Sequence, residues 1–79
     1  MEYKTKGTCS TRIDFDLDGD IVRNVRFMGG CNGNLQGISR LVEGMPAREA
    51  ISKLEGIRCG FKSTSCPDQL AKALKAALS

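Results

Sequence analysis

The sequence predicts an α+β domain, in which a small antiparallel β-hairpin or sheet precedes three helices. Two segments near the start alternate apolar and polar residues around an Asp-Gly pair, as in a β-hairpin. The second half carries apolar residues at helical spacing, interrupted by glycine and proline. Strands followed by helices are the pattern of an α+β fold. Because 79 residues suffice for one domain only, residues 1–79 are taken as a single domain.

The strands are expected in the first third of the chain. Residues 3–6 are assigned to a short edge strand, and residues 12–17 to a half-buried strand with apolar residues on one face. Its apolar residues are Ile13, Phe15 and Leu17. Asp18 and Gly19 are expected to supply the positive φ angles of a tight turn. The return strand, residues 20–28, is rich in β-branched side chains.

Three helices are expected after the glycine-rich segment that ends the second strand. The first covers residues 34–43 and is capped by Gly44; the second has Pro46 in its first turn and ends at Gly56. The third begins at Pro67 and runs to about residue 78. The residues expected to face the core are Leu35, Ile38, Leu41 and Val42 in the first helix, Ala50, Ile51 and Leu54 in the second, and Leu70, Ala73, Leu74, Ala77 and Leu78 in the third.

Composition excludes several classes of function. The net charge is only +3 and the basic residues are scattered without interleaved aromatics, which argues against a nucleic-acid partner. No apolar run suits a membrane span or a signal peptide, so a cytoplasmic location without membrane contact is expected. Thiols stay reduced in the cytosol, where cysteine groups more often bind metals or carry redox chemistry than form disulfides.

The four cysteines are the candidate site. Cys9, Cys31, Cys59 and Cys66 all lie in breaks or at the ends of predicted elements, and the chain has no histidine. No C-x-x-C pair is present, so a local zinc knuckle is absent. Cys31 precedes the first helix and Cys66 is placed at the N-cap of the last, where free N–H groups favour thiolate over thiol. We therefore expect the four sulfurs to converge on one metal site.

Neighbouring residues are expected to support this site, and three alternatives compete with it. The supporting residues are Gly30, Asn32, Ser65 and Asp68. The cysteines could instead be small buried side chains, or two of them could form a disulfide. The segment 14–20 matches the start of an EF-hand calcium loop, but Val25 stands where the loop needs glutamate, so an acidic strand face is preferred. Without histidine, no Ser-His-Asp or Cys-His catalytic set exists.

Residues 64–68 spell TSCPD, and the chain resembles the stand-alone, four-cysteine members of the TSCPD domain family. The resemblance also covers residues 7–9, 29–35 and 59–60, and so nearly the whole chain. It implies metal binding through the cysteines. Related domains end the adenosylcobalamin-dependent ribonucleotide reductases, which implies a ribonucleotide reductase or another metalloenzyme as partner. This chain has no room for a reductase barrel or a cobalamin site, so it is not expected to be an enzyme alone.

The chain is more distantly similar to the U-type iron–sulfur scaffold proteins. Cys9, Cys31 and Cys66 fall where that pattern has its three cysteines. The chain departs from it in two ways, because Ser65 stands where the pattern has histidine and Cys59 is additional. A fourth thiolate favours a closed structural site over one that passes its cluster on.

Three functions follow from the sequence. Four thiolates suit a zinc ion and suit an iron–sulfur cluster almost equally, which predicts a metal-binding module without catalysis of its own. Alternatively, Cys66 could attack and Cys59 resolve in a thiol redox partner of a reductase. An iron–sulfur scaffold, which transfers its cluster to an acceptor, is the third.

Overall fold

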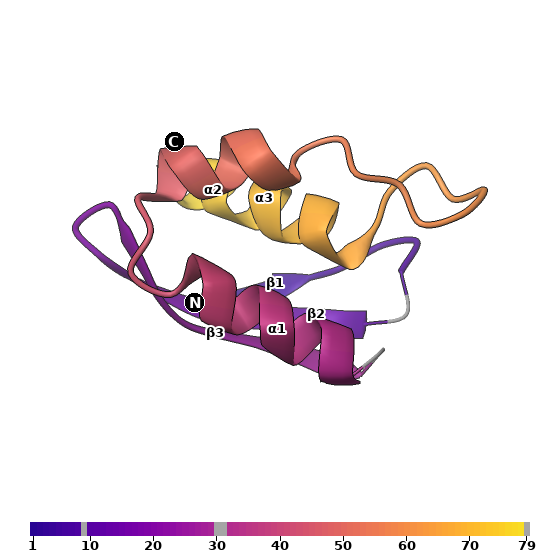
Figure 1. Cartoon of the computed structure of the whole chain (residues 1–79), viewed down its shortest axis with the longest axis horizontal. Coiled ribbons are helices and arrows are strands. Elements are labelled where there is room, and N and C mark those ends of the chain that lie inside the picture. The colour runs from indigo at the N-terminus through magenta and orange to yellow at the C-terminus, as the bar shows by residue number, and fades with distance from the viewer. Residues whose placement is uncertain (9, 30–31, 79) are drawn as a thin grey trace.

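A three-stranded antiparallel sheet followed by three helices makes up the fold (Figure 1). The computed structural model describes residues 1–8, 10–29 and 32–78. The strands are β1 (Glu2–Lys4), β2 (Ser10–Asp18) and β3 (Ile21–Gly29), in the order β1–β2–β3. The helices are α1 (Asn32–Val42), α2 (Ala47–Leu54) and α3 (Cys66–Leu78). The predicted α+β arrangement is confirmed, with element bounds shifted by one or two residues.

The helices cover one face of the sheet and enclose the core. α1 packs on β3, while α3 lies over β2 and contacts α2 along its length (Figure 1). The buried side chains of the core are Ile13, Phe15, Val22, Val25, Leu35, Val42, Ala47, Ala50, Ile51, Leu70, Ala71, Ala73 and Leu74. The apolar alternation of the strands and most residues of the three helical stripes therefore meet in the core as the sequence predicts.

A β-bulge in β3 changes which of its residues face the core. Asn24 and Val25 together oppose Phe15 of β2, and Asn24 takes a left-handed backbone conformation with φ +55°. The extra residue rotates the strand, so that Val22 and Val25 are both buried although they are three residues apart. Regular alternation would have placed one of them on the open face.

A second bulge, at the start of β2, directs Ser10 into the molecule. Ser10 pairs with Gly29 and Arg12 with Met28, which leaves Thr11 as an extra residue on β2. As a result Ser10 and Ile13 are both buried on the helix-covered face. This bulge therefore determines which side chain of β2 faces the start of the last helix.

The left-handed conformation of Asn24 leads to a first prediction. Asn24→Val should lower the free energy of unfolding by about 1–2 kcal/mol, because a β-branched residue tolerates positive φ poorly. Asn24→Gly should stay within about 0.5 kcal/mol of the native protein, because glycine accepts this φ freely. Urea unfolding of both variants makes the measurement. Equal losses for the two would show that the side chain, rather than the backbone conformation, matters.

Several predicted details are wrong. The hairpin loop is Gly19–Asp20 rather than Asp18–Gly19, and only Gly19 has positive φ, at +63°. Leu41 is 77% exposed, because α1 packs on β3 and barely touches the other helices, which leaves this side of α1 in solvent. Leu78, at the end of α3, is also exposed.

The segment that matches the start of an EF-hand loop forms a strand, as expected from the sequence. Its residues 14–18 belong to β2, with Phe15 buried and Asp16 exposed. Among the described helices, none is long and apolar enough to cross a membrane.

Candidate functional site

Three segments that carry or adjoin cysteines meet at one end of the molecule (Figure 1). Ser10, the residue after Cys9, pairs with Gly29 at the end of β3. The hydroxyl of Ser10 lies 3.0 Å from Sγ of Cys66, at the start of α3, within hydrogen-bonding distance. Ser10 is only 2% exposed, so this contact is shielded from water. The bulge in β2 thus places the start of this strand next to the start of α3.

A pocket of about 300 Å³ opens at the same place, between α1 and the start of α3. It is lined by Thr8, Asn34, Leu35, Ile38, Ile57, Arg58, Cys59, Lys62, Ser65, Cys66 and Pro67. Two of the four predicted ligands, Cys59 and Cys66, therefore share one pocket. Cys66 is half-buried and Cys59 is exposed.

The other two cysteines, Cys9 and Cys31, lie outside the described residues, as does Gly30. Thr8, which directly precedes Cys9, lines the pocket, and so does Asn34, three residues after Cys31. Asn32 is the first residue of α1. Within ranges 1–8, 10–29 and 32–78, no group of three or more His, Cys, Asp or Glu side chains could hold a metal ion.

Backbone hydrogen bonds hold Cys59 on a tight turn. The N–H of Lys62 donates to the carbonyl of Cys59 at 3.0 Å, and the N–H of Cys59 donates to the carbonyl of Thr64 at 3.2 Å. Gly60 follows Cys59 with φ +58°, a conformation that the turn requires and that glycine adopts freely. These hydrogen bonds fix the position of the Cys59 backbone beside the pocket.

The polar residues of the TSCPD string form a buried network around the start of α3. Asp68, only 3% exposed, accepts the N–H of Gly56 at 2.7 Å and also the hydroxyl of Thr64. Lys72 lies 3.4 Å from the same carboxylate. The Thr64 hydrogen bond is the main cause that lowers the pKa of Asp68; burial opposes it, and Gly56 and Lys72 add to it. Asp68 therefore anchors the segment before α3 as a carboxylate.

Gln69 extends this network to the start of the chain. Its side-chain nitrogen donates to the Thr64 hydroxyl at 3.0 Å, and its side-chain oxygen accepts the N–H of Lys6 at 3.2 Å. The residues leading to β2 are thereby tied to the same helix end. Because Lys6 and Gln69 are far apart in the sequence, no local pattern indicates this contact.

Ser65, and not Cys66, caps α3. The helix begins at Cys66, and the Ser65 hydroxyl accepts the N–H of Asp68 at 3.2 Å while it donates to the carbonyl of Ile57 at 2.6 Å. The predicted N-cap role of Cys66 is wrong by one residue. The neighbouring polar side chains therefore stabilise the start of the helix, while Cys66 lines the pocket.

Capping by Ser65 gives a second prediction. Ser65→Ala should lower the free energy of unfolding by about 1–2 kcal/mol, because it removes the cap of α3 and the bond to Ile57. Ser63→Ala is the matched control, since Ser63 is exposed, and it should change stability by less than about 0.5 kcal/mol. Thermal unfolding compares the two. Equal effects would mean that the cap contributes nothing specific.

Sequence reasoning missed Ser10, Thr64 and Gln69 as parts of the site. Ser10 was the hardest to find, because its inward direction depends on the bulge at Thr11. Its position next to Cys9 was the one available signal. Thr64 and Gln69 flank the predicted cysteine. Thr64 donates to Asp68 within the same segment, whereas Gln69 also accepts the N–H of Lys6 from the start of the chain.

Comparison with known families gives one match. A model of the TSCPD domain matches residues 1–78 of the chain. The comparisons with curated proteins and with solved structures found no match.

Proposed function

Because the chain belongs to the TSCPD domain family, we propose that it is a metal-binding module with four cysteine ligands. Cys9, Cys31, Cys59 and Cys66 would supply thiolates to one zinc ion or one iron–sulfur cluster. The observation that carries the proposal is the shared pocket of Cys59 and Cys66, which Thr8, the neighbour of Cys9, also lines.

The donor set of the pocket fits a thiophilic metal. No Asp, Glu or His is among the described residues that line it, so sulfur is the one strong ligand type they offer. Hard cations such as Mg²⁺ and Ca²⁺ prefer oxygen, whereas zinc and iron–sulfur clusters accept four thiolates. Arg58 and Lys62 line the same pocket and bring positive charge towards a centre that four thiolates would make negative.

The metal would act mainly on stability. A domain of this length has a small core, and a site that joins the strand ends to α3 would couple metal binding to folding. We place the protein in the cytosol, where the thiols would stay reduced. There it would serve a ribonucleotide reductase or another metalloenzyme without catalysing a reaction itself.

Metal analysis of protein purified anaerobically without chelator tests the proposal. We expect zinc near one ion per chain, or iron with sulfide and visible charge-transfer absorption. Protein treated with a chelator under reducing conditions is the control and should have a lower melting temperature. Neither metal at a useful stoichiometry would contradict the proposal.

A thiol redox function is the second candidate, and the shared pocket of Cys59 and Cys66 favours it as well. In that case the two thiols would form a disulfide, passing two electrons and two protons to a disulfide of the partner reductase. Thiol titration separates the two functions. Redox thiols react quickly and pair reversibly, whereas metal ligands react slowly until the metal is removed.

A further inference from the structure

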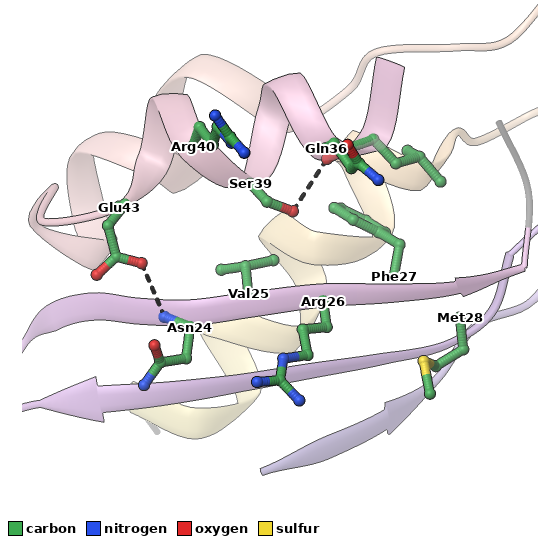
Figure 2. Close-up of a pocket in the computed structure, with 10 residues that line it drawn as sticks. Asn24, Val25, Arg26, Phe27, Met28, Gln36, Ser39, Arg40 and Glu43 are labelled. Atoms are coloured by element: carbon green, nitrogen blue, oxygen red, sulfur yellow. Dashed lines mark hydrogen bonds between the residues drawn. The ribbon is translucent and has the colours of Figure 1, made fainter. Parts of the chain in front are cut away.

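A groove of about 440 Å³ lies between β3 and α1 (Figure 2). One wall is formed by residues 24–28 of β3 and the other by α1 and the residue that follows it. The helix side contributes Leu35, Gln36, Ser39, Arg40 and Glu43. The groove therefore follows the outer edge of the sheet, since β3 is an edge strand.

The first half of this edge is covered by the chain itself. The N–H of Gly44 donates to the carbonyl of Val22 at 2.8 Å, and the N–H of Val22 donates to the carbonyl of Met45 at 2.9 Å. At the bulge, the N–H of Asn24 donates to the Glu43 carboxylate at 2.9 Å (Figure 2). Hydrogen bonds within the chain therefore cover the edge of β3 as far as Asn24.

Beyond Asn24, the edge of β3 presents backbone groups that could pair with an added strand. The N–H of Phe15 in β2 donates to the carbonyl of Met1, on the β1 side of the strand. Backbone groups of every second residue point to the same side of a strand, so the N–H and C=O of Ile13 also face β1. Phe27 pairs opposite Ile13, and its N–H and C=O therefore face away from β2, towards the groove. Outside the ladder with β2, the structure shows no hydrogen bond to either group among the residues that it describes. An added strand would find this donor and acceptor.

The side chains along this edge differ between its two faces. Figure 2 shows Val25 and Phe27 pointing towards α1, and Arg26 pointing to the opposite side of the strand. Arg26 and Arg40 are exposed and form no ion pair among the described residues, whereas Arg23 is paired with Glu43 at 3.5 Å. A strand placed here would meet apolar side chains on one face and, around them, two arginines without ion pairs among the described residues, of which Arg26 has Asp14 of β2 as its cross-strand neighbour.

We propose that the edge of β3 docks an extended acidic segment of a partner protein as a fourth strand. The segment's apolar residues face α1 over Phe27, and its alternate carboxylates face Arg26 and, at the rim of the groove, Arg40. Backbone pairing with Phe27 supplies affinity and the arginines supply selectivity for acidic residues. A second copy of this chain fits less well, because it would bring the same positive groove to both sides of the interface.

NMR titration of the full chain as purified tests this inference. The probe is a short acetylated peptide of alternating glutamate and valine, and the control peptide has lysine in place of glutamate. The acidic peptide should shift the amide signal of Phe27 and slow its hydrogen exchange. The double variant Arg26→Glu and Arg40→Glu should weaken binding by about tenfold or more and transfer preference to the lysine peptide. Arg48→Glu, at an exposed position of α2 away from the groove, should leave binding unchanged.

Three results would overturn the inference. The first is an acidic peptide that leaves the Phe27 amide unaffected. The second is equal binding of both peptides, or of the native and charge-reversed proteins. The third is protection of the Phe27 amide with doubling of the mass in concentrated protein alone, which would make this edge an interface between two copies. None of these readouts depends on which metal the cysteines bind.

Discussion

Cys66→Ser should release the metal and lower the melting temperature together. Serine nearly preserves the volume and the hydrogen bond to Ser10, which lies 3.0 Å from the sulfur, but it is a poor ligand for a thiophilic metal. A ligand present at 100 times its Kd stabilises a fold by about 2.7 kcal/mol, so a loss of about 3 kcal/mol or more is expected. For a domain of this size that equals about 12–24 °C in melting temperature.

Two comparisons isolate the metal in this experiment. Ser65, and not Cys66, caps α3, so the substitution leaves the cap intact. In chelator, the native protein and Cys66→Ser should have nearly equal melting temperatures, and Ser63→Ala should match the native protein in both metal content and stability. Metal analysis and calorimetry on the same samples provide the test. Native metal content and melting temperature in Cys66→Ser would defeat the account, and the redox function would then be favoured.

Asp68→Ala should be strongly destabilising. It leaves the N–H of Gly56 and the hydroxyl of Thr64 without their buried acceptor, at a cost of about 1–3 kcal/mol each. We expect a loss of about 2–5 kcal/mol in urea unfolding. Asp68→Asn, which keeps one acceptor oxygen, should lose less. Asp18→Asn is the control, because Asp18 is exposed and the described structure gives its side chain no partner.

The same carboxylate makes stability depend on pH. Because the folded-state pKa of Asp68 is lowered, chiefly by Thr64, its contribution is fully present above the unfolded-state pKa of about 3.9. The contribution is lost as the pH falls through the folded-state pKa. Native protein should therefore lose more stability between neutral and acid pH than Asp68→Asn does. Parallel pH profiles of the two would show that Asp68 is not bound as described.

Local patterns predicted most of the fold. Burial could be predicted from the alternation of Ile13, Phe15 and Leu17 and from the helical spacing of Leu70 and Leu74. Side chains alternate between the two faces of a strand and recur on one face of a helix, so each spacing indicates which residues face the core. The prediction failed where tertiary context decides. Leu41 continues a helical stripe, yet none of the described elements covers that side of α1.

For the candidate site, the structure describes two of the four predicted ligands, Cys59 and Cys66, and they line one pocket. The convergence of all four sulfurs on a metal stays a prediction. The two bulges could not be foreseen, because one extra residue changes strand register without changing composition. Nor could the cap of α3, because Ser65 and Cys66 are neighbours and a shift of one residue exchanges their roles.

X-ray absorption at the metal edge of the purified protein tests the central claim most directly. We predict a first coordination shell of sulfur alone, with metal–sulfur distances of about 2.3 Å for zinc. Any metal that Cys59→Ser or Cys66→Ser retains should have fewer sulfur atoms in that shell. A native shell that contains nitrogen or oxygen, or that Cys66→Ser leaves unchanged, would contradict a four-thiolate site.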